Sequence, residues 1–320
     1  MGGKGRKKVG VALGGGTMRG VTHIGVLEIF EENKIPIDVL VGCSSGAIVA
    51  AAYACGKLDE FKKIVLALDK KDRRRVLDFR LSGEGLIRGE KIKTFFNFLT
   101  GDKNFSDIKK LKLAFVATDA NTGREVIIDK GKIADALEIT TALPGLAPLK
   151  RYEGKLLFDG GTAMLVPAKV TYGLGADIVI GVDVSVNRGA ITRAVGDIRQ
   201  LMKKSRLKRI VEPVFWMQNK ILNVDEKKFL GKARELMKRI NLLDDFEKRK
   251  FNFIEAYLIG LKAISADYKR GLFKDEDCDV AIHPKVLHIK RGDITHSAEM
   301  IEEGREAASR ALGNIKNLIL

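Results

Sequence analysis

Two short apolar runs near the start of the chain are each followed by a glycine-containing turn and then by a helical pattern. Val9–Leu13 and Ile37–Val41 have the β-branched composition of buried strands. Gly14–Gly20 leads from the first run into a helix, and Gly42–Gly46 leads from the second into an alanine-rich helix. Because strand and helix alternate, this part of the chain favours a parallel sheet with crossover helices.

Later segments extend the same pattern. Lys112–Thr118 and Glu125–Asp129 flank Asn121-Thr122-Gly123, which predicts a hairpin. Further elements are expected as strands at Lys155–Phe158, Asp177–Val184 and Val280–Ile282, and as a last helix over Ser297–Ile315. The pattern over 57–110 is helical but broken around Ser82–Gly85, so we assign it to covering helices and loops. The expected fold class is a three-layer α/β/α architecture with a mainly parallel central sheet.

Positive charge is concentrated in one stretch of the chain. The 57 Lys and Arg against 41 Asp and Glu give a formal net charge of +16, and residues 188–274 hold 22 of the basic residues against ten acidic ones, a net +12. Apolar residues recur there at helical spacing among basic ones, at Phe229, Ala233, Leu236, Ile240 and Leu243. We therefore divide the chain into an α/β domain over 1–187 and 276–320 and a basic helical insertion or cover over 188–275.

The charge of the basic stretch predicts an anionic partner, and its composition argues against nucleic acid as that partner. Its densest cluster, Lys203–Arg209, has no interleaved aromatic residues and matches no nucleic-acid-binding module, so nucleic acid is not expected. Three roles for this stretch remain as alternatives: a lid, a peripheral contact with an anionic membrane, or a plain solvated cover. No apolar run approaches the roughly 20 residues that cross a bilayer.

The remaining composition points to a reducing compartment. Three cysteines form no C-x-x-C pair, and the basic start of the chain is not followed by a signal-peptide apolar core, so we expect a cytoplasmic protein. Four scattered histidines make a structural zinc site unexpected. The sequence does not fix the oligomeric state.

The first glycine turn does not fit a nucleotide-binding motif. A dinucleotide fingerprint that starts at Gly14 needs glycine where Arg19 stands, and a P-loop needs lysine where Val21 follows Gly20. Its unhindered N–H groups, at the start of a helix, can stabilise either a phosphate or a developing oxyanion. A tight turn without catalysis is the alternative.

The second glycine turn, Gly42-Cys43-Ser44-Ser45-Gly46, fits G-x-S-x-G with Ser44 at the nucleophile position. In this motif a sharp turn strains the serine backbone and exposes its hydroxyl, and Gly42 and Gly46 leave room for that geometry. An ordinary helix start is the alternative. The pattern alone is short enough to occur by chance.

A serine nucleophile needs a base, and Asp159 is a candidate. It follows the predicted strand Lys155–Phe158 and precedes Gly160-Gly161. The end of another parallel strand is the natural place for a group that meets the serine, so we expect Asp159 there. On its own, Asp-Gly-Gly is more often a β-turn.

The three turns, in this order, resemble the patatin-like phospholipase family. The resemblance extends through Gly20–Leu27 and Ala142–Gly145 and covers roughly 8–186. It implies hydrolysis of a lipid carboxylic ester, as by a phospholipase A, lysophospholipase or esterase, without metal or organic cofactor. The residue roles that it implies are a nucleophile at Ser44, a general base at Asp159, an oxyanion hole at the Gly14, Gly15 and Gly16 amides, and a supporting Arg19, with Gly160 and Gly161 forming the acid turn.

Histidine distinguishes this Ser–Asp dyad from the triad of an α/β-hydrolase-type esterase. His283, His288 and His296 all follow the serine and the acid, as a triad requires, whereas His23 precedes the serine and is expected as a hydrogen-bonded helix residue. An acidic limb of activity near the histidine pKa of about 6.5 would count against the dyad. Burial of Asp159 would raise its pKa toward that of histidine, and the acidic limb would then not distinguish the two.

Overall fold

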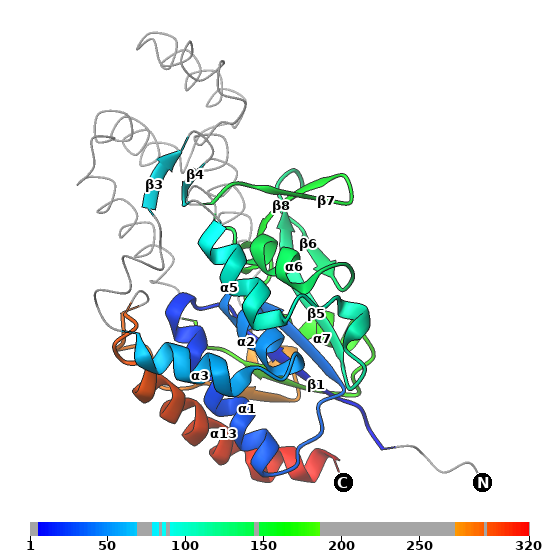
Figure 1. The fold of residues 1–320 in the computed structure, drawn as a ribbon. Helices are drawn as coiled ribbons and strands as arrows, with labels where there is room; N and C mark the ends of the chain where they lie inside the picture. The colour runs from blue at the N-terminus through cyan, green and yellow to red at the C-terminus, as the bar shows by residue number, and fades with distance from the viewer. Residues whose placement is uncertain are drawn as a thin grey trace, which may run out of the picture. The chain divides into compact units, whose positions relative to one another are not determined.

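The described part of the computed structural model is built around an eight-stranded sheet (Figure 1). The strand order is β10-β9-β1-β2-β5-β8-β7, and β6 also pairs with β5. The strands are β1 (Val9–Leu13), β2 (Val39–Cys43), β5 (Lys112–Asp119), β6 (Glu125–Ile128), β7 (Lys150–Tyr152), β8 (Lys155–Asp159), β9 (Ile178–Val182) and β10 (Val280–Ile282). The strands β10, β9, β1, β2 and β5 run parallel, as the sequence predicts.

The structure describes residues 6–68, 79–82, 85–87, 90–143, 147–185, 273–290 and 293–319. The basic helical insertion predicted over 188–275, including its amphipathic helix, lies outside these residues except for 273–275. The described helices are α1 (Thr22–Glu32), α2 (Ser45–Ala54), α3 (Leu58–Ala67), α5 (Glu90–Thr100), α6 (Ile133–Thr140), α7 (Ala168–Gly173) and α13 (Ser297–Ile319). Among the described residues, no helix is long and apolar enough to span a bilayer.

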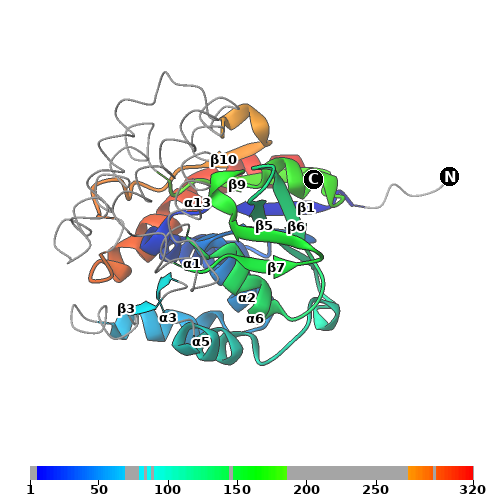
Figure 2. The same ribbon diagram turned by 90° about the horizontal axis from the view of Figure 1, so that it is seen from above.

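Helices cover both faces of the sheet, which gives the expected three layers. Along β1, Val11 belongs to the larger apolar core, which includes residues of α1, α2, α3, α5, α6 and α13. The next residue, Ala12, belongs to a smaller core with Val170 of α7 on the other face. Figure 2 shows α2, α3, α5 and α6 gathered on one side of the strands. This alternation follows from the two-residue repeat of a strand.

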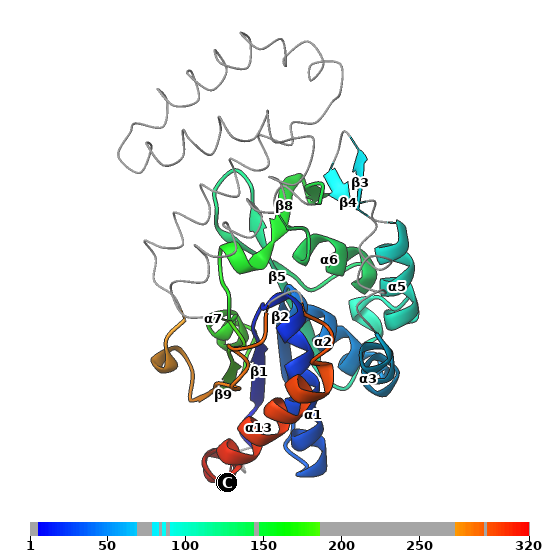
Figure 3. The ribbon, with the colours of Figure 1, turned by 90° about the vertical axis from the view of Figure 1, so that its left-hand side faces the viewer.

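The C-terminal helix packs closely along α1, and Figure 3 shows the two helices side by side. At their crossing, a Cβ added to Gly304 would lie 2.1 Å from the Thr22 carbonyl oxygen, so only glycine fits there. Arg305 also forms ion pairs with Glu28 and Glu32 of α1, at 2.9 Å in each case. The predicted helix over 297–315 is therefore confirmed and runs four residues further.

One prediction of strand direction is wrong. Asp159 was expected at the end of a parallel strand, but β8 is antiparallel to both β5 and β7. The cause is the tight β7–β8 hairpin, whose turn residues Glu153 and Gly154 both have positive φ, 47° and 76°. A two-residue turn with positive φ at both positions reverses the chain.

The region over 57–110 also differs from the prediction of helices and loops alone. It contains α3 and α5, but β3 (Phe79–Ser82) and β4 (Gly85–Ile87) lie between them as a two-stranded antiparallel sheet.

Candidate active site

Two strands that arrive from opposite directions share one edge of β5. The strand β2 pairs with β5 over Lys112–Val116, and β8 pairs with the next residues, Ala117–Asp119. Because β6 occupies the other edge over Phe115–Thr118, β2 and β8 lie end to end along the remaining edge. Ser44 follows the last residue of β2, and Asp159 is the last residue of β8. The register of the sheet therefore brings these two residues together.

Ser44 has an unusual backbone conformation. It stands between β2 and α2 with φ 51° and ψ −121°. Positive φ is costly for a residue with a side chain and persists only where the surroundings enforce it. Ser44 is also the residue before α2, so its side chain lies at the positive end of the helix dipole.

The Ser44 hydroxyl and the Asp159 carboxylate are in direct contact. Ser44 Oγ donates a hydrogen bond to Asp159 Oδ2 at 2.5 Å. The other carboxylate oxygen, Oδ1, accepts the Gly161 N–H at 2.8 Å. Both side chains are nearly covered, with exposed fractions of 9% for Ser44 and 4% for Asp159. The carboxylate thus has one oxygen fixed by the main chain and the other directed at the serine.

Burial changes the acidity of Asp159. Loss of hydration raises its pKa from 3.8 to about 6, against the opposing effect of the hydrogen bonds from Ser44 and Gly161. The group is therefore ionised at neutral pH and still basic enough to take a proton. An acidic limb near pH 6 is consequently expected from this aspartate, so its position no longer distinguishes a dyad from a triad.

Two buried threonines, which the sequence analysis did not single out, hold the backbone on either side of the Ser44–Asp159 contact. Thr140 Oγ1 accepts the Ser44 N–H at 3.1 Å. Thr118 Oγ1 donates to the Asp159 carbonyl oxygen at 2.8 Å and accepts the Ala163 N–H at 3.2 Å. No sequence motif marks either threonine, because their role depends on the pairing of distant strands.

The three amides of the first glycine turn each have an acceptor within the protein. Gly14 N–H donates to the Val182 carbonyl and Gly15 N–H to the Leu165 carbonyl, both at 3.0 Å. Gly16 N–H donates to Ser45 Oγ at 2.9 Å. The turn lies close to the serine, since a Cβ added to Gly15 would be 3.2 Å from Ser44 Cβ. Of the three acceptors, only the Ser45 hydroxyl can turn away by rotation about a side-chain bond.

Arg19 is directed toward the C-terminal part of the chain. Its guanidinium donates to the carbonyl oxygens of Leu287, at 3.0 Å, and Ile289, in the segment between β10 and α13. The side chain is 4% exposed. Arg19 therefore joins the glycine turn to a segment more than 260 residues away in sequence.

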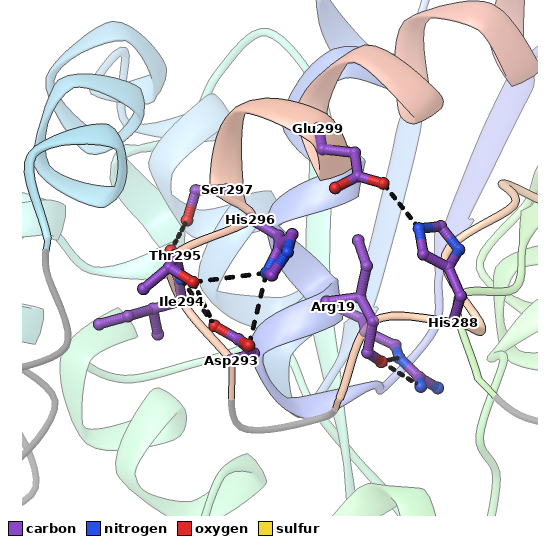
Figure 4. Close-up of polar contacts among 9 residues, drawn as sticks. Arg19, His288, Asp293, Ile294, Thr295, His296, Ser297 and Glu299 are labelled. Atoms are coloured by element: carbon purple, nitrogen blue, oxygen red, sulfur yellow. Dashed lines mark hydrogen bonds and ion pairs between the residues drawn. The ribbon is translucent and has the colours of Figure 1, made fainter.

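The four histidines have partners other than Ser44. His283 Nε2 contacts Asp275 Oδ1 at 2.8 Å and His288 Nε2 contacts Glu299 Oε1 at 2.6 Å. His296 lies beside Asp293 and Thr295, and Figure 4 shows both this group and the His288–Glu299 pair near the start of α13. His23 is fully buried and its Nε2–H donates to the Gly14 carbonyl at 2.8 Å. Burial lowers the pKa of His23 to about 4, so it is neutral.

The glycines next to the serine and the aspartate allow main chains to approach closely. A Cβ added to Gly46 would lie 2.3 Å from the Leu13 carbonyl oxygen, and one added to Gly42 would lie 2.4 Å from Ala47 Cα. A Cβ added to Gly160 would lie 2.1 Å from the Val116 carbonyl oxygen. Larger residues would push α2 away from β1, or the acid turn away from β5.

Comparison with known proteins places these features in one matched region. The model of the family described as patatin-like phospholipase matches residues 11–172, which include the glycine turn, Ser44 and Asp159. An uncharacterised NTE family protein of Mycobacterium tuberculosis is 33% identical over 178 residues, or 56% of this chain and 49% of that protein.

Other similarities cover smaller or more distant parts. The lysophospholipase NTE1 of Pyricularia oryzae is 30% identical over 198 residues, which are 60% of this chain and 13% of that protein. The matched region thus spans at most about half the length of these curated relatives. Among solved structures, VipD from Legionella pneumophila aligns over 97% of this chain and 67% of its own with a TM-score of 0.41 and 12% identity.

Proposed function

This chain belongs to the patatin-like phospholipase family, and from that premise we propose that it is a serine acyl hydrolase that cleaves carboxylic ester bonds of lipids through Ser44 and Asp159. The observation that carries the proposal is the 2.5 Å hydrogen bond from Ser44 Oγ to a buried carboxylate. A hydroxyl that donates directly to an ionised base is arranged to become a nucleophile.

The first half of the reaction transfers the acyl group to the protein. Ser44 Oγ attacks the ester carbonyl carbon while its proton passes to Asp159 Oδ2, and the carbonyl oxygen becomes negatively charged. When the ester C–O bond breaks, the Asp159 proton passes to the leaving oxygen, which departs as an alcohol. The acyl group stays on Ser44.

In the second half a water molecule takes the place of the alcohol. The water oxygen attacks the acyl carbon while Asp159 accepts a proton from the water. Asp159 then gives this proton to Ser44 Oγ when the acyl–serine bond breaks. The products are a fatty acid and the original serine. One carboxylate with a pKa of about 6 serves both halves, because it is a base at neutral pH and a competent acid once protonated.

The oxyanion needs hydrogen-bond donors that are not already committed elsewhere. Gly14 and Gly15 donate to main-chain carbonyls and fix the shape of the turn. The Gly16 N–H becomes a donor to the oxyanion when the Ser45 hydroxyl rotates away. The Ser45 N–H is the second donor, because the first amides of a helix have no intrahelical acceptor. Arg19 acts on this arrangement indirectly, through its bonds to Leu287 and Ile289.

The family and one named relative support the choice of a lipid ester as substrate. The fungal protein that aligns with this chain is called a lysophospholipase. A single-chain phospholipid is therefore the first substrate to test, beside a diacyl phospholipid, a monoacylglycerol and a small ester. The basic stretch over 188–274, with its net charge of +12, supports peripheral binding to an anionic lipid surface. Sedimentation with anionic and with neutral vesicles tests that binding.

The proposal is tested by fatty-acid release from this panel by the wild type, Ser44→Ala and Asp159→Asn. Both variants should lose at least about 10³-fold in turnover, because each lacks one member of a unit that acts together. Ser297→Ala is the matched control, since Ser297 is also a buried serine but its hydroxyl donates to the Ile294 carbonyl, away from Asp159. Release by Ser44→Ala at the wild-type rate would contradict the proposal.

A further inference from the structure

The hydroxyl of Thr140, the last residue of α6, joins Ser44 to the central sheet. Its Oγ1 accepts the Ser44 N–H at 3.1 Å and donates to the Val116 carbonyl oxygen at 2.5 Å. The side chain has no exposed surface. One hydroxyl therefore satisfies both a main-chain donor and a main-chain acceptor in the interior.

The donor that Thr140 accepts belongs to the residue with the most demanding backbone in the site. Ser44 has φ 51°, and a residue in this region returns to negative φ unless its neighbours prevent it. A change of φ at Ser44 would swing its side chain away from Asp159. The hydrogen bond to Thr140 opposes that change, because it fixes the direction of the Ser44 N–H.

The acceptor that Thr140 contacts lies at the point where β2 and β8 meet. Val116 is the β5 residue opposite Cys43, and Ala117, the next residue, is opposite Asp159. The Thr140 hydroxyl thus ties the serine to the same short stretch of β5 that positions the aspartate.

We propose that Thr140 is a positioning residue for the Ser44 nucleophile: its hydroxyl holds the Ser44 backbone at positive φ and so keeps Ser44 Oγ directed at Asp159. This inference rests on the proposed function, because it assigns a role in the reaction of the same two residues. It adds a requirement for a hydroxyl, and not only for a side chain of that shape, at position 140.

The test replaces Thr140 with valine, which keeps the shape and removes the hydroxyl, and with serine, which keeps the hydroxyl. Thr100→Val is the matched control, because Thr100 is also a fully buried last residue of a helix but its hydroxyl donates to the Phe96 carbonyl in α5, at 2.8 Å. Turnover of a small ester, fluorophosphonate labelling of Ser44 and thermal unfolding are measured for each variant. If Thr140→Val does not fold, Thr140→Cys takes its place, since sulfur is only a weak acceptor.

We expect Thr140→Val to lose kcat by about ten- to hundredfold with KM changed by less than about twofold, because a misplaced nucleophile slows chemistry and not binding. Labelling of Ser44 should slow in parallel, and Thr140→Ser should restore most of both. Thr100→Val should keep the wild-type kcat even if its Tm falls as much as that of Thr140→Val. Equal kcat in Thr140→Val and the wild type, or no recovery in Thr140→Ser, would overturn the inference. Full activity in Ser44→Ala would instead overturn the proposed function.

Discussion

Ser44 and Asp159 are 115 residues apart in sequence, yet Ser44 Oγ donates to Asp159 Oδ2 at 2.5 Å. Their contact follows from the pairing of Cys43 with Val116 and of Asp159 with Ala117 on consecutive positions of β5. A nucleophile placed by one strand and a base placed by another are held by the sheet itself, and not by a flexible loop.

The rate should depend on the ionisation of Asp159. Since burial raises its pKa to about 6, kcat/KM should fall tenfold per pH unit well below pH 6 and level off above about pH 7. A pH–rate profile on an ester without ionisable groups measures this limb. An acidic limb near pH 4, the usual range of an exposed aspartate, would contradict the buried base.

The late histidines should be dispensable for hydrolysis. His283, His288 and His296 are 48%, 59% and 46% exposed and contact other residues. Alanine at each position, one at a time, should therefore leave kcat/KM within about threefold of the wild type. Loss of several orders of magnitude in any one variant would favour a triad.

Folding stability should fall in acid because of His23. Burial lowers the pKa of His23 from 6.5 to about 4, so the unfolded chain takes up a proton in this range before the folded one does. The stability from neutral His23 is complete above about pH 6.5 and is lost as the pH falls toward 4, by about 3 kcal/mol in total.

The measurement for His23 is chemical unfolding of the wild type and of His23→Gln between pH 4 and 7. The difference in the free energy of unfolding between the wild type and His23→Gln isolates the contribution of His23. Asp159 contributes to both proteins in the opposite direction, because its raised pKa makes stability decrease as the pH rises from about 4 to 6. A difference that does not vary with pH would show that His23 titrates alike in the folded and unfolded chains.

Removing the Ser45 hydroxyl should lower the stability of the folded protein and raise its rate of hydrolysis. Ser45→Ala leaves the Gly16 N–H without its 2.9 Å acceptor, which should lower the free energy of unfolding by about 1–3 kcal/mol. The oxyanion then reaches this donor without displacing a hydroxyl, so kcat/KM should rise by about three- to tenfold. A fall in kcat/KM would instead mean that Ser45 supports the turn during the reaction.

The strands next to the serine were predictable from local patterns, whereas the direction of β8 was not. Val9–Leu13 forms β1 as predicted, and β2 begins two residues later than the apolar run suggested. The reversal before β8 depends on Glu153 at positive φ, and glutamate is not a residue that signals such a turn. The usual Asn-Gly or Asp-Gly signature of this hairpin is absent from 153–154.

The groups that support the candidate site could not be predicted from the sequence, because their contacts also depend on how distant segments pack. Thr140, Thr118 and Ser45 contact Ser44, Asp159 and the glycine turn only after separate strands and helices have packed. The carbonyls that bind Arg19 lie in the segment before α13. A motif identifies side chains that act on a substrate, but not the main-chain contacts that hold them.

Covalent labelling with a fluorophosphonate at pH 8, followed by peptide mapping, tests most directly whether Ser44 is the nucleophile and Asp159 its base. The proteins compared are the wild type, Ser44→Ala, Asp159→Asn and Ser297→Ala. A Ser44–Asp159 dyad predicts a single adduct on Ser44 in the wild type and in Ser297→Ala, and no adduct in Ser44→Ala. Labelling of Asp159→Asn should be slowed by at least about a hundredfold. An adduct on a different serine, or labelling of Asp159→Asn at the wild-type rate, would contradict it.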